Sequence, residues 1–400
     1  MGNYDYKSNI WKYYSFELFM GLWFTLPISV IFLRSFDISY GQIGLIEFVS
    51  AIIVVVLEIP TGAFSDSIGK KISLILAALL WCAAMIAIGF GSTFRMFILG
   101  FVLWAISDSL LSGTKSAFVY DSLKRLGKEK SYLRVKGISN FIESFSIIIA
   151  SLFGAYLFTV NVKLPWIFFA GSAFLASLFM LAAKEPYTNH SKYNVTNQIK
   201  LMKQSISFVA SHSTIRWIVI YASTIILPFT IFNNLVKQPY ILDMGFQVVS
   251  LGWITAIMYG VGGLFSVFSK EIEKRVGEKG SFFLVTFVHG LGFMLLGLFR
   301  FEPMLIIVIL IYMSRFYKDN ILEYYINNHV GSKNRTTVLS INNLVVSLLS
   351  SFYVLIGGRL LDIFPMQAVL FASGIIVVIL CLPIVITRFY LKKTLVSTGK

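Results

Sequence analysis

A set of ionisable side chains stands inside long apolar stretches of this sequence, where a charge is costly unless it has a partner or a task. A buried carboxylic acid keeps its proton at higher pH than in water, which suits a proton carrier, and clustered cations suit the binding of a carboxylate or phosphate. These side chains are therefore our candidates for proton coupling or substrate binding: Glu58, Asp108, Glu143, Arg315, Lys318, Asp319 and Glu323.

The acids of the first half of the chain each allow two interpretations. Glu58, in VVVLEIPTG, is expected to be buried, either as a proton carrier or as a rigid polar pin between helices. Asp108, in WAISDSLLSGTK, indicates a cavity or an ion pair, and Lys115 is expected to snorkel to the cytoplasmic surface. Glu143 and Glu17 lie nearer the ends of their apolar stretches, so each is either functional or a residue of the cytoplasmic boundary.

The densest charged stretch is YMSRFYKDNILEYY in the second half. Arg315, Asp319 and Glu323 follow one another at intervals of four residues, so on a helix they share a face, with Lys318 beside them. Arg315 and Asp319 are expected to form a buried pair, which serves either transport or structure alone. His289 is isolated in TFVHGLG, and we expect it to make a hydrogen bond between helices.

The elements that position these residues follow from composition. Hydrophobic residues make up 57% of the chain and charged residues 13%, about half the charged share of a soluble domain. The apolar runs are continuous and about 20 residues long, as in membrane-spanning helices. We therefore predict an all-α membrane protein with twelve transmembrane helices, near residues 12–33, 41–64, 72–90, 94–118, 137–158, 164–183, 214–236, 249–269, 280–299, 303–326, 338–358 and 366–388.

The distribution of basic residues predicts the orientation. The net charge of +15 does not indicate nucleic-acid binding, because lysines and arginines gather in alternate loops between apolar runs, as the positive-inside rule requires. Both termini and the hydrophilic segment 184–212 are then cytoplasmic. The opposite loops hold few bases, to which we assign Arg34, Arg95, Lys163, Lys237, Arg300 and Arg359. We expect a monomer in the cytoplasmic membrane, with a bundle at 1–183, a linker at 184–212 and a second bundle at 213–400.

The two halves show signs of an internal repeat. A shift of 208 residues places Gly69-Lys70-Lys71 on Gly277-Glu278-Lys279, each between the second and third helices of its half. Parallel repeats of this kind occur in transporters, with a site between the halves near mid-membrane. The repeat predicts two six-helix bundles related by a pseudo-two-fold axis.

The stretch GAFSDSIGKK, between the second and third helices, resembles the loop signature of the major facilitator superfamily. The matching residues are Gly62, Asp66, Gly69, Lys70 and Lys71, whereas Ser67 replaces the usual base. The resemblance implies a gating motif that latches the halves against the start of the eleventh helix when the cytoplasmic side is closed, joined by Asp121 in AFVYDSLKR. Gly62 would let two helices approach closely.

The resemblance extends to the drug and metabolite efflux branch, and it implies proton-coupled export of a small, apolar or amphipathic compound by alternating access. Two features of that branch are absent, since Asp108 and Ser109 stand near the place of its arginine and SFSIIIASLFGAY contains no proline. Protons would then depend on acids such as Glu58 or Asp108. Uptake of a polar or anionic nutrient through Arg315 and Lys318, and a non-transporting receptor or scaffold, are the alternatives.

Catalytic signatures are missing from the sequence, which has no nucleotide-binding loop, no HExxH and no cysteine–histidine metal spacing. We therefore expect no enzymatic activity, no cofactor and no metal. The expected partners are a small-molecule substrate, protons and the lipid bilayer, with no nucleic acid.

Overall fold

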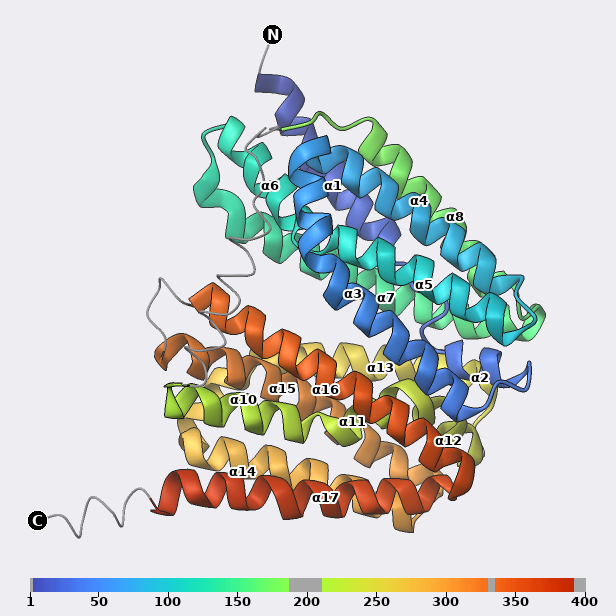
Figure 1. Cartoon of the computed structure of the whole chain (residues 1–400), viewed down its shortest axis with the longest axis vertical. Helices are drawn as coiled ribbons and strands as arrows, with labels where there is room; N and C mark the ends of the chain where they lie inside the picture. Colours follow the sequence, from blue (N-terminus) through green and yellow to red (C-terminus); the bar gives the residue numbers. More distant parts are fainter. Residues whose placement is uncertain (1–2, 187–210, 330–334, 392–400) are drawn as a thin grey trace, which may run out of the picture. The chain divides into compact units, whose positions relative to one another are not determined.

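Figure 1 shows the computed structural model, which describes residues 3–186, 211–329 and 335–391 and contains helices but no strand within them. The predicted all-α class is confirmed. Contacts between Cα atoms divide the chain into two compact units. Unit 1 comprises residues 1–38, 46–198 and 247–256, and unit 2 comprises 39–45, 199–246 and 257–400.

Unit 1 packs its helices around α4 (Lys70–Gly89), which lies against α5 (Phe94–Leu111) on one side and α8 (Leu164–Leu181) on the other, as Figure 1 shows for the α4 and α8 pair. α1 (Asn3–Met20) packs on α8. The remaining elements are α2 (Ser29–Arg34), most of α3 (Tyr40–Ile68), α6 (Thr114–Arg125), η1 (Glu129–Ser131), α7 (Tyr132–Val160) and the start of α13 (Val248–Val267).

The first predicted span, 12–33, is wrong as a single helix. α1 ends at Met20, and the chain turns through residues 21–28 before α2 begins. Pro27 lacks a backbone N–H and so cannot continue the helical ladder. The turn packs closely on α7 at Gly154. A side chain there would not fit, since a Cβ at Gly154 would lie 1.9 Å from the carbonyl oxygen of Phe24.

The predicted span 94–118 is also interrupted. Gly113 adopts a φ of 73°, in the left-handed region that glycine reaches without strain, and it separates α5 from α6. The break divides two candidate residues, so that Asp108 belongs to α5 and Lys115 to α6.

Unit 2 packs α14 (Ser269–Leu298) between α15 (Leu305–His329) and α17 (Met366–Ile386), and Figure 1 shows α14 and α17 side by side. Its core includes Tyr221, whose hydroxyl lies 3.0 Å from both the carbonyl oxygen of Phe282 and the hydroxyl of Thr286. The other elements of this unit are α10 (Ser213–Ile225), α11 (Leu227–Ile231), η2 (Phe232–Val236), α12 (Lys237–Asp243), η3 (Glu302–Met304), α16 (Arg335–Ile363) and η4 (Thr387–Leu391).

The predicted helix 214–236 is broken as well. α10 gives way to α11 next to Pro228, and α11 leads into a π-helical turn, η2, which passes directly into α12. A proline in a helix interior removes one hydrogen bond and clashes with the preceding turn. Because η2 passes directly into α12, the helical path continues past the predicted end at residue 236.

The repeat predicted from the 208-residue shift is visible in the backbone. Gly69 has a φ of 111° and Gly277 a φ of 68°, and each breaks the helical path at the equivalent position of its half. Each unit also packs its third helix, α4 or the second part of α14, against a fourth and a sixth helix. The two units thus repeat one packing scheme.

Among the described residues, ten helices are long and apolar enough to cross a membrane. α1 and α15 are not among these ten, and both carry several charged residues. The chain is a multi-pass helical membrane protein, and the count of twelve spans stays a prediction.

Candidate gating and transport sites

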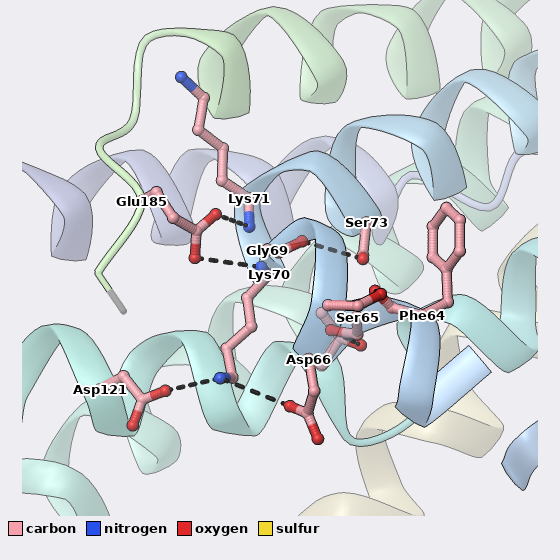
Figure 2. A network of polar contacts seen from close by, with 11 residues as sticks. Phe64, Ser65, Asp66, Gly69, Lys70, Lys71, Ser73, Asp121 and Glu185 are labelled. Carbon is pink, nitrogen blue, oxygen red and sulfur yellow. Dashed lines mark hydrogen bonds and ion pairs between the residues drawn. The ribbon is translucent and has the colours of Figure 1, made fainter. Parts of the chain in front are cut away.

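Lys70 is the centre of the polar network at the start of α4 (Figure 2). Its ammonium lies 2.8 Å from a carboxylate oxygen of Asp121 on α6 and 3.7 Å from one of Asp66 on α3. The Lys70 side chain is 9% exposed, whereas that of Asp66 is half exposed. Lys71 points its ammonium away from both acids (Figure 2). The structure therefore brings Asp66, Lys70 and Asp121 together and leaves Lys71 apart.

Glu185, just after α8, holds the backbone of the same motif. Its carboxylate accepts hydrogen bonds from the backbone N–H groups of Lys70 at 3.1 Å and Lys71 at 2.8 Å, as Figure 2 shows. A carboxylate at this place satisfies free donors of the first helical turn and complements the helix dipole. The segment is anchored further by Asn9, which bonds the backbone of Lys184 twice. Sequence analysis places Glu185 in the linker and predicts no role for it.

Two parts of the predicted latch concern Gly62 and the eleventh helix. A Cβ at Gly62 would meet no described atom within 4 Å, so the expected close helix approach at Gly62 stays a prediction. The side chains at the start of the eleventh helix, 335–341, lie outside the described residues. The latch against that helix therefore stays a prediction.

Alanine substitutions at the two motif glycines are expected to change stability in opposite directions. Gly69→Ala places a side chain at a left-handed φ, with its Cβ 2.6 Å from the Glu185 carboxylate, so unfolding should become easier by about 1–3 kcal/mol. Gly62→Ala replaces glycine inside α3 in open space and should stabilise by about 0.5–1 kcal/mol. Thermal unfolding of the purified variants measures both, and equal shifts would contradict the assigned backbone.

Lys115 organises a cluster of acids in unit 1. Its ammonium lies 2.8 Å from a carboxylate oxygen of Glu17 on α1 and 4.0 Å from one of Glu143 on α7. The Glu17 side chain is only 2% exposed, and its other oxygen lacks a hydrogen-bond partner among the described residues. Asp108 is partly buried on α5, on the far side of the Gly113 break from Lys115. Lys115 is therefore shared by one buried and one partly exposed carboxylate, and Asp108 is near enough to interact with it electrostatically.

Two expectations about these residues are wrong. Lys115 does not snorkel away from the helices, because its ammonium pairs with the buried Glu17, and the expected boundary position of Glu17 stays a prediction. Glu58 is not buried, because its side chain is exposed on α3. Its proposed role as a proton carrier depended on burial, so that physical basis is lost.

The charged residues of α15 pair differently from the prediction. Arg315 and Asp319 are 3.8 Å apart, but their side chains are 30% and 48% exposed, so the expected buried pair is wrong. Lys318 is the closer partner, with its ammonium 2.8 Å from Asp319. Glu323 is exposed and makes no ion pair with any described residue. His289 lies 3.3 Å from the hydroxyl of Ser314 on α15, which confirms the hydrogen bond between helices.

Lys237 is the functional candidate that sequence reasoning missed. Charge counting places it in an outer loop, but the structure buries it to 2% exposure at the start of α12. Its ammonium lies 3.2 Å from the Asn233 side-chain oxygen and 3.2 Å from the Tyr312 hydroxyl. The sequence feature that could have indicated its burial is Pro228. A proline predicts an irregular helix, and such a helix can extend beyond residue 236 and bury Lys237.

Comparison with known proteins fixes the family. The family model described as Major Facilitator Superfamily matches residues 15–316, about three quarters of the chain. The chain belongs to this superfamily. An uncharacterized MFS-type transporter of Bacillus subtilis (strain 168), YxaM, is 26% identical over 70% of this chain and 70% of that protein. Multidrug resistance protein 2 of the same organism is 23% identical over 91% of this chain and 90% of that protein.

A solved structure supports the same fold. The crystal structure of the nucleoside transporter NupG matches with a TM-score of 0.78 at 12% identity, over 96% of this chain and 99% of that one. At such low identity the likeness shows the fold alone. This facilitator-superfamily chain is therefore a membrane transporter by family, and its substrate and energy source have to be argued from its own residues.

Proposed function

We propose that this superfamily member is a secondary active transporter that exports a small amphipathic or apolar organic compound across the cytoplasmic membrane in exchange for protons. The relatives named multidrug and quinolone resistance proteins support the direction and the class of compound. The observation that carries the proton coupling is the contact of Lys115 with Glu17 and Glu143, with Asp108 near enough to interact with Lys115 electrostatically.

The cluster suits proton exchange because its charges do not balance. Lys115 is shared by two carboxylates, and Glu17, although almost fully buried, has an oxygen with no hydrogen-bond partner among the described residues. Several negative charges in a low-dielectric site repel one another, which favours protonation of one of them. Neutralising one acid frees Lys115 to bind the other more closely, so that one proton changes contacts on three helices.

The proposed cycle is alternating access between two halves joined by the linker 184–212, with both termini cytoplasmic. The pairing of Lys70 with Asp66 and Asp121 gives the cytoplasmic end of unit 1 one defined arrangement, which is the gating role that we assign to it. Gly62, Gly69 and Lys71 complete the gating motif. Glu185 connects the linker to this motif, because its carboxylate binds the backbone of Lys70 and Lys71, so that a movement of the linker would also move the motif.

The experiment that tests the function uses everted membrane vesicles from cells that express the chain. Vesicles energised to an acidic lumen are expected to accumulate one or more members of a panel of cationic, neutral and anionic fluorescent amphiphiles, and an uncoupler should abolish the accumulation. Asp108→Asn should weaken the dependence on the pH gradient, whereas Glu58→Gln, at the exposed position, should retain it.

Vesicles without the protein are the control for passive partition. Equal accumulation with and without the protein across the panel would contradict export. Accumulation only in right-side-out vesicles with an inward proton gradient would reverse the direction and favour nutrient uptake.

A further inference from the structure

Lys237 is a buried cation without an acidic partner. Its side chain is 2% exposed, and no carboxylate oxygen of the described residues lies within 4.0 Å of its ammonium. A buried charge that lacks a counter-ion is strongly unfavourable, so an ionisable residue in such a place is a candidate for binding a ligand of opposite charge. Neither the outer-loop interpretation nor the proton cluster of unit 1 accounts for it.

The hydrogen bonds of Lys237 leave its charge uncompensated. The two acceptors are the neutral oxygens of Asn233 and Tyr312, and the Tyr312 hydroxyl itself donates to Asn233. An ammonium has three donors, so one remains available. Asn233 belongs to the π-helical turn η2, directly before Lys237. Such turns widen the helix and often occur at functional sites.

Arg315 lies next to this group and is also incompletely paired. It follows Tyr312 by one helical turn on α15. The ring of Phe229 contacts both, with its centroid 5.1 Å from the Tyr312 ring centroid and 5.1 Å from the Arg315 guanidinium. The Arg315 Nε makes no hydrogen bond with any described residue. The nearest acid, Asp319, is 3.8 Å away and is bound more closely by Lys318.

Aromatic rings wall the same place. The Arg315 guanidinium lies over Phe229 and over Phe316, whose ring centroid is 5.3 Å from it. Tyr259 contacts both Tyr312 and Phe316 edge-on or tilted. A guanidinium between rings keeps its planar fork in a fixed direction, which matches the two oxygens of a carboxylate.

We propose that Lys237 and Arg315 form an anion site in unit 2 that binds the carboxylate of an amphipathic compound, with Asn233 and Tyr312 as neutral hydrogen-bonding partners. The rings of Phe229, Phe316 and Tyr259 receive the apolar body. Arg315, which is partly exposed, supplies one positive charge, and the buried Lys237 supplies the second. If the protein is the exporter proposed above, this site indicates that its substrates carry a carboxylate. The binding of a carboxylate at the site does not depend on that function; only the description of the ligand as a substrate does.

Binding to the purified protein tests the site without requiring transport. The probes are benzoate, 2-naphthoate and 1-pyrenebutyrate, each compared with its own primary amide, which has nearly the same shape and no charge. At least one carboxylate is expected to bind about tenfold more tightly than its amide. Lys237→Met and Arg315→Gln should each remove that preference while changing amide binding less than about twofold.

Lys274→Met, at an exposed position of α14 in the same unit, is the matched control and should keep the preference. Arg315→Gln, at a partly exposed position, keeps the test valid if Lys237→Met fails to fold. Inorganic phosphate and phosphatidylglycerol are added as competitors, and stronger competition by either than by any carboxylate would overturn the assignment to a carboxylate. No carboxylate preferred over its amide, or a preference that survives both variants, would overturn the site.

The binding result is independent of the vesicle experiment. A carboxylate preference without energised export would leave the anion site standing and remove the proposed function. Energised export without any preference for a carboxylate in the binding experiment would leave the proposed function standing and remove the anion site.

Discussion

Lys70→Met is expected to lower the free energy of unfolding by about 2–3 kcal/mol, because two carboxylates lose the cation between them. Asp121, at 2.8 Å, is the closer partner and is mostly buried, so it loses more than the half-exposed Asp66. The same change removes the ion pair between α4 and α6 to which we assign a gating role. Export by the variant should therefore fall even where the protein remains folded and expressed.

The neighbouring Lys71 provides the informative comparison. Its ammonium points away from the two acids (Figure 2), so Lys71→Met should change the unfolding free energy by less than about 0.5 kcal/mol. Lys124→Met, at an exposed position of α6 one turn from Asp121, is the control for loss of an exposed positive charge. Denaturant unfolding and export rates of the variants separate the cases. Equal losses for Lys70 and Lys71 would show that the motif needs only positive charge.

The motif illustrates how far sequence reasoning reaches. The spacing of GAFSDSIGKK predicts a turn with an acid and two bases, and the resemblance to the superfamily motif adds Asp121. The motif cannot show which lysine pairs with the acids, because that depends on the direction in which α4 leaves Gly69. This direction is set by the φ of 111° at Gly69 and by the hydrogen bonds to Glu185. A residue more than a hundred positions away therefore decides the geometry of the motif.

The buried charges were harder to predict because their positions depend on helix breaks. Gly113 separates α5 from α6, and the new start of α6 brings Lys115 to Glu17. The irregular path around Pro228 has a similar effect on Lys237, which a regular span ending at 236 would leave in a loop. Hydrophobic runs define the existence of spans well, whereas prolines and glycines within them determine which polar side chains meet.

Lys115→Met is the substitution with the largest expected effect on stability, at about 3–5 kcal/mol. It leaves Glu17, which is 2% exposed, as a charge without its cation. Glu17→Gln alone should cost less, because the amide still offers an oxygen to Lys115. The double variant Glu17→Gln/Lys115→Met should recover about 2–3 kcal/mol relative to the sum of the single losses. Denaturant unfolding of the four proteins measures this coupling.

An exposed pair in the same chain separates burial from charge. Arg300 and Asp243 are 3.1 Å apart, close to the spacing of the Lys115 pair, but both side chains are nearly half exposed. Arg300→Met should therefore cost less than about 1 kcal/mol. A similar loss for Arg300 and Lys115 would contradict the low-dielectric setting on which proton exchange depends. A large loss at Lys115 alone would support the coupling that we propose, in which protonation of Glu17 changes the forces between α1, α6 and α7.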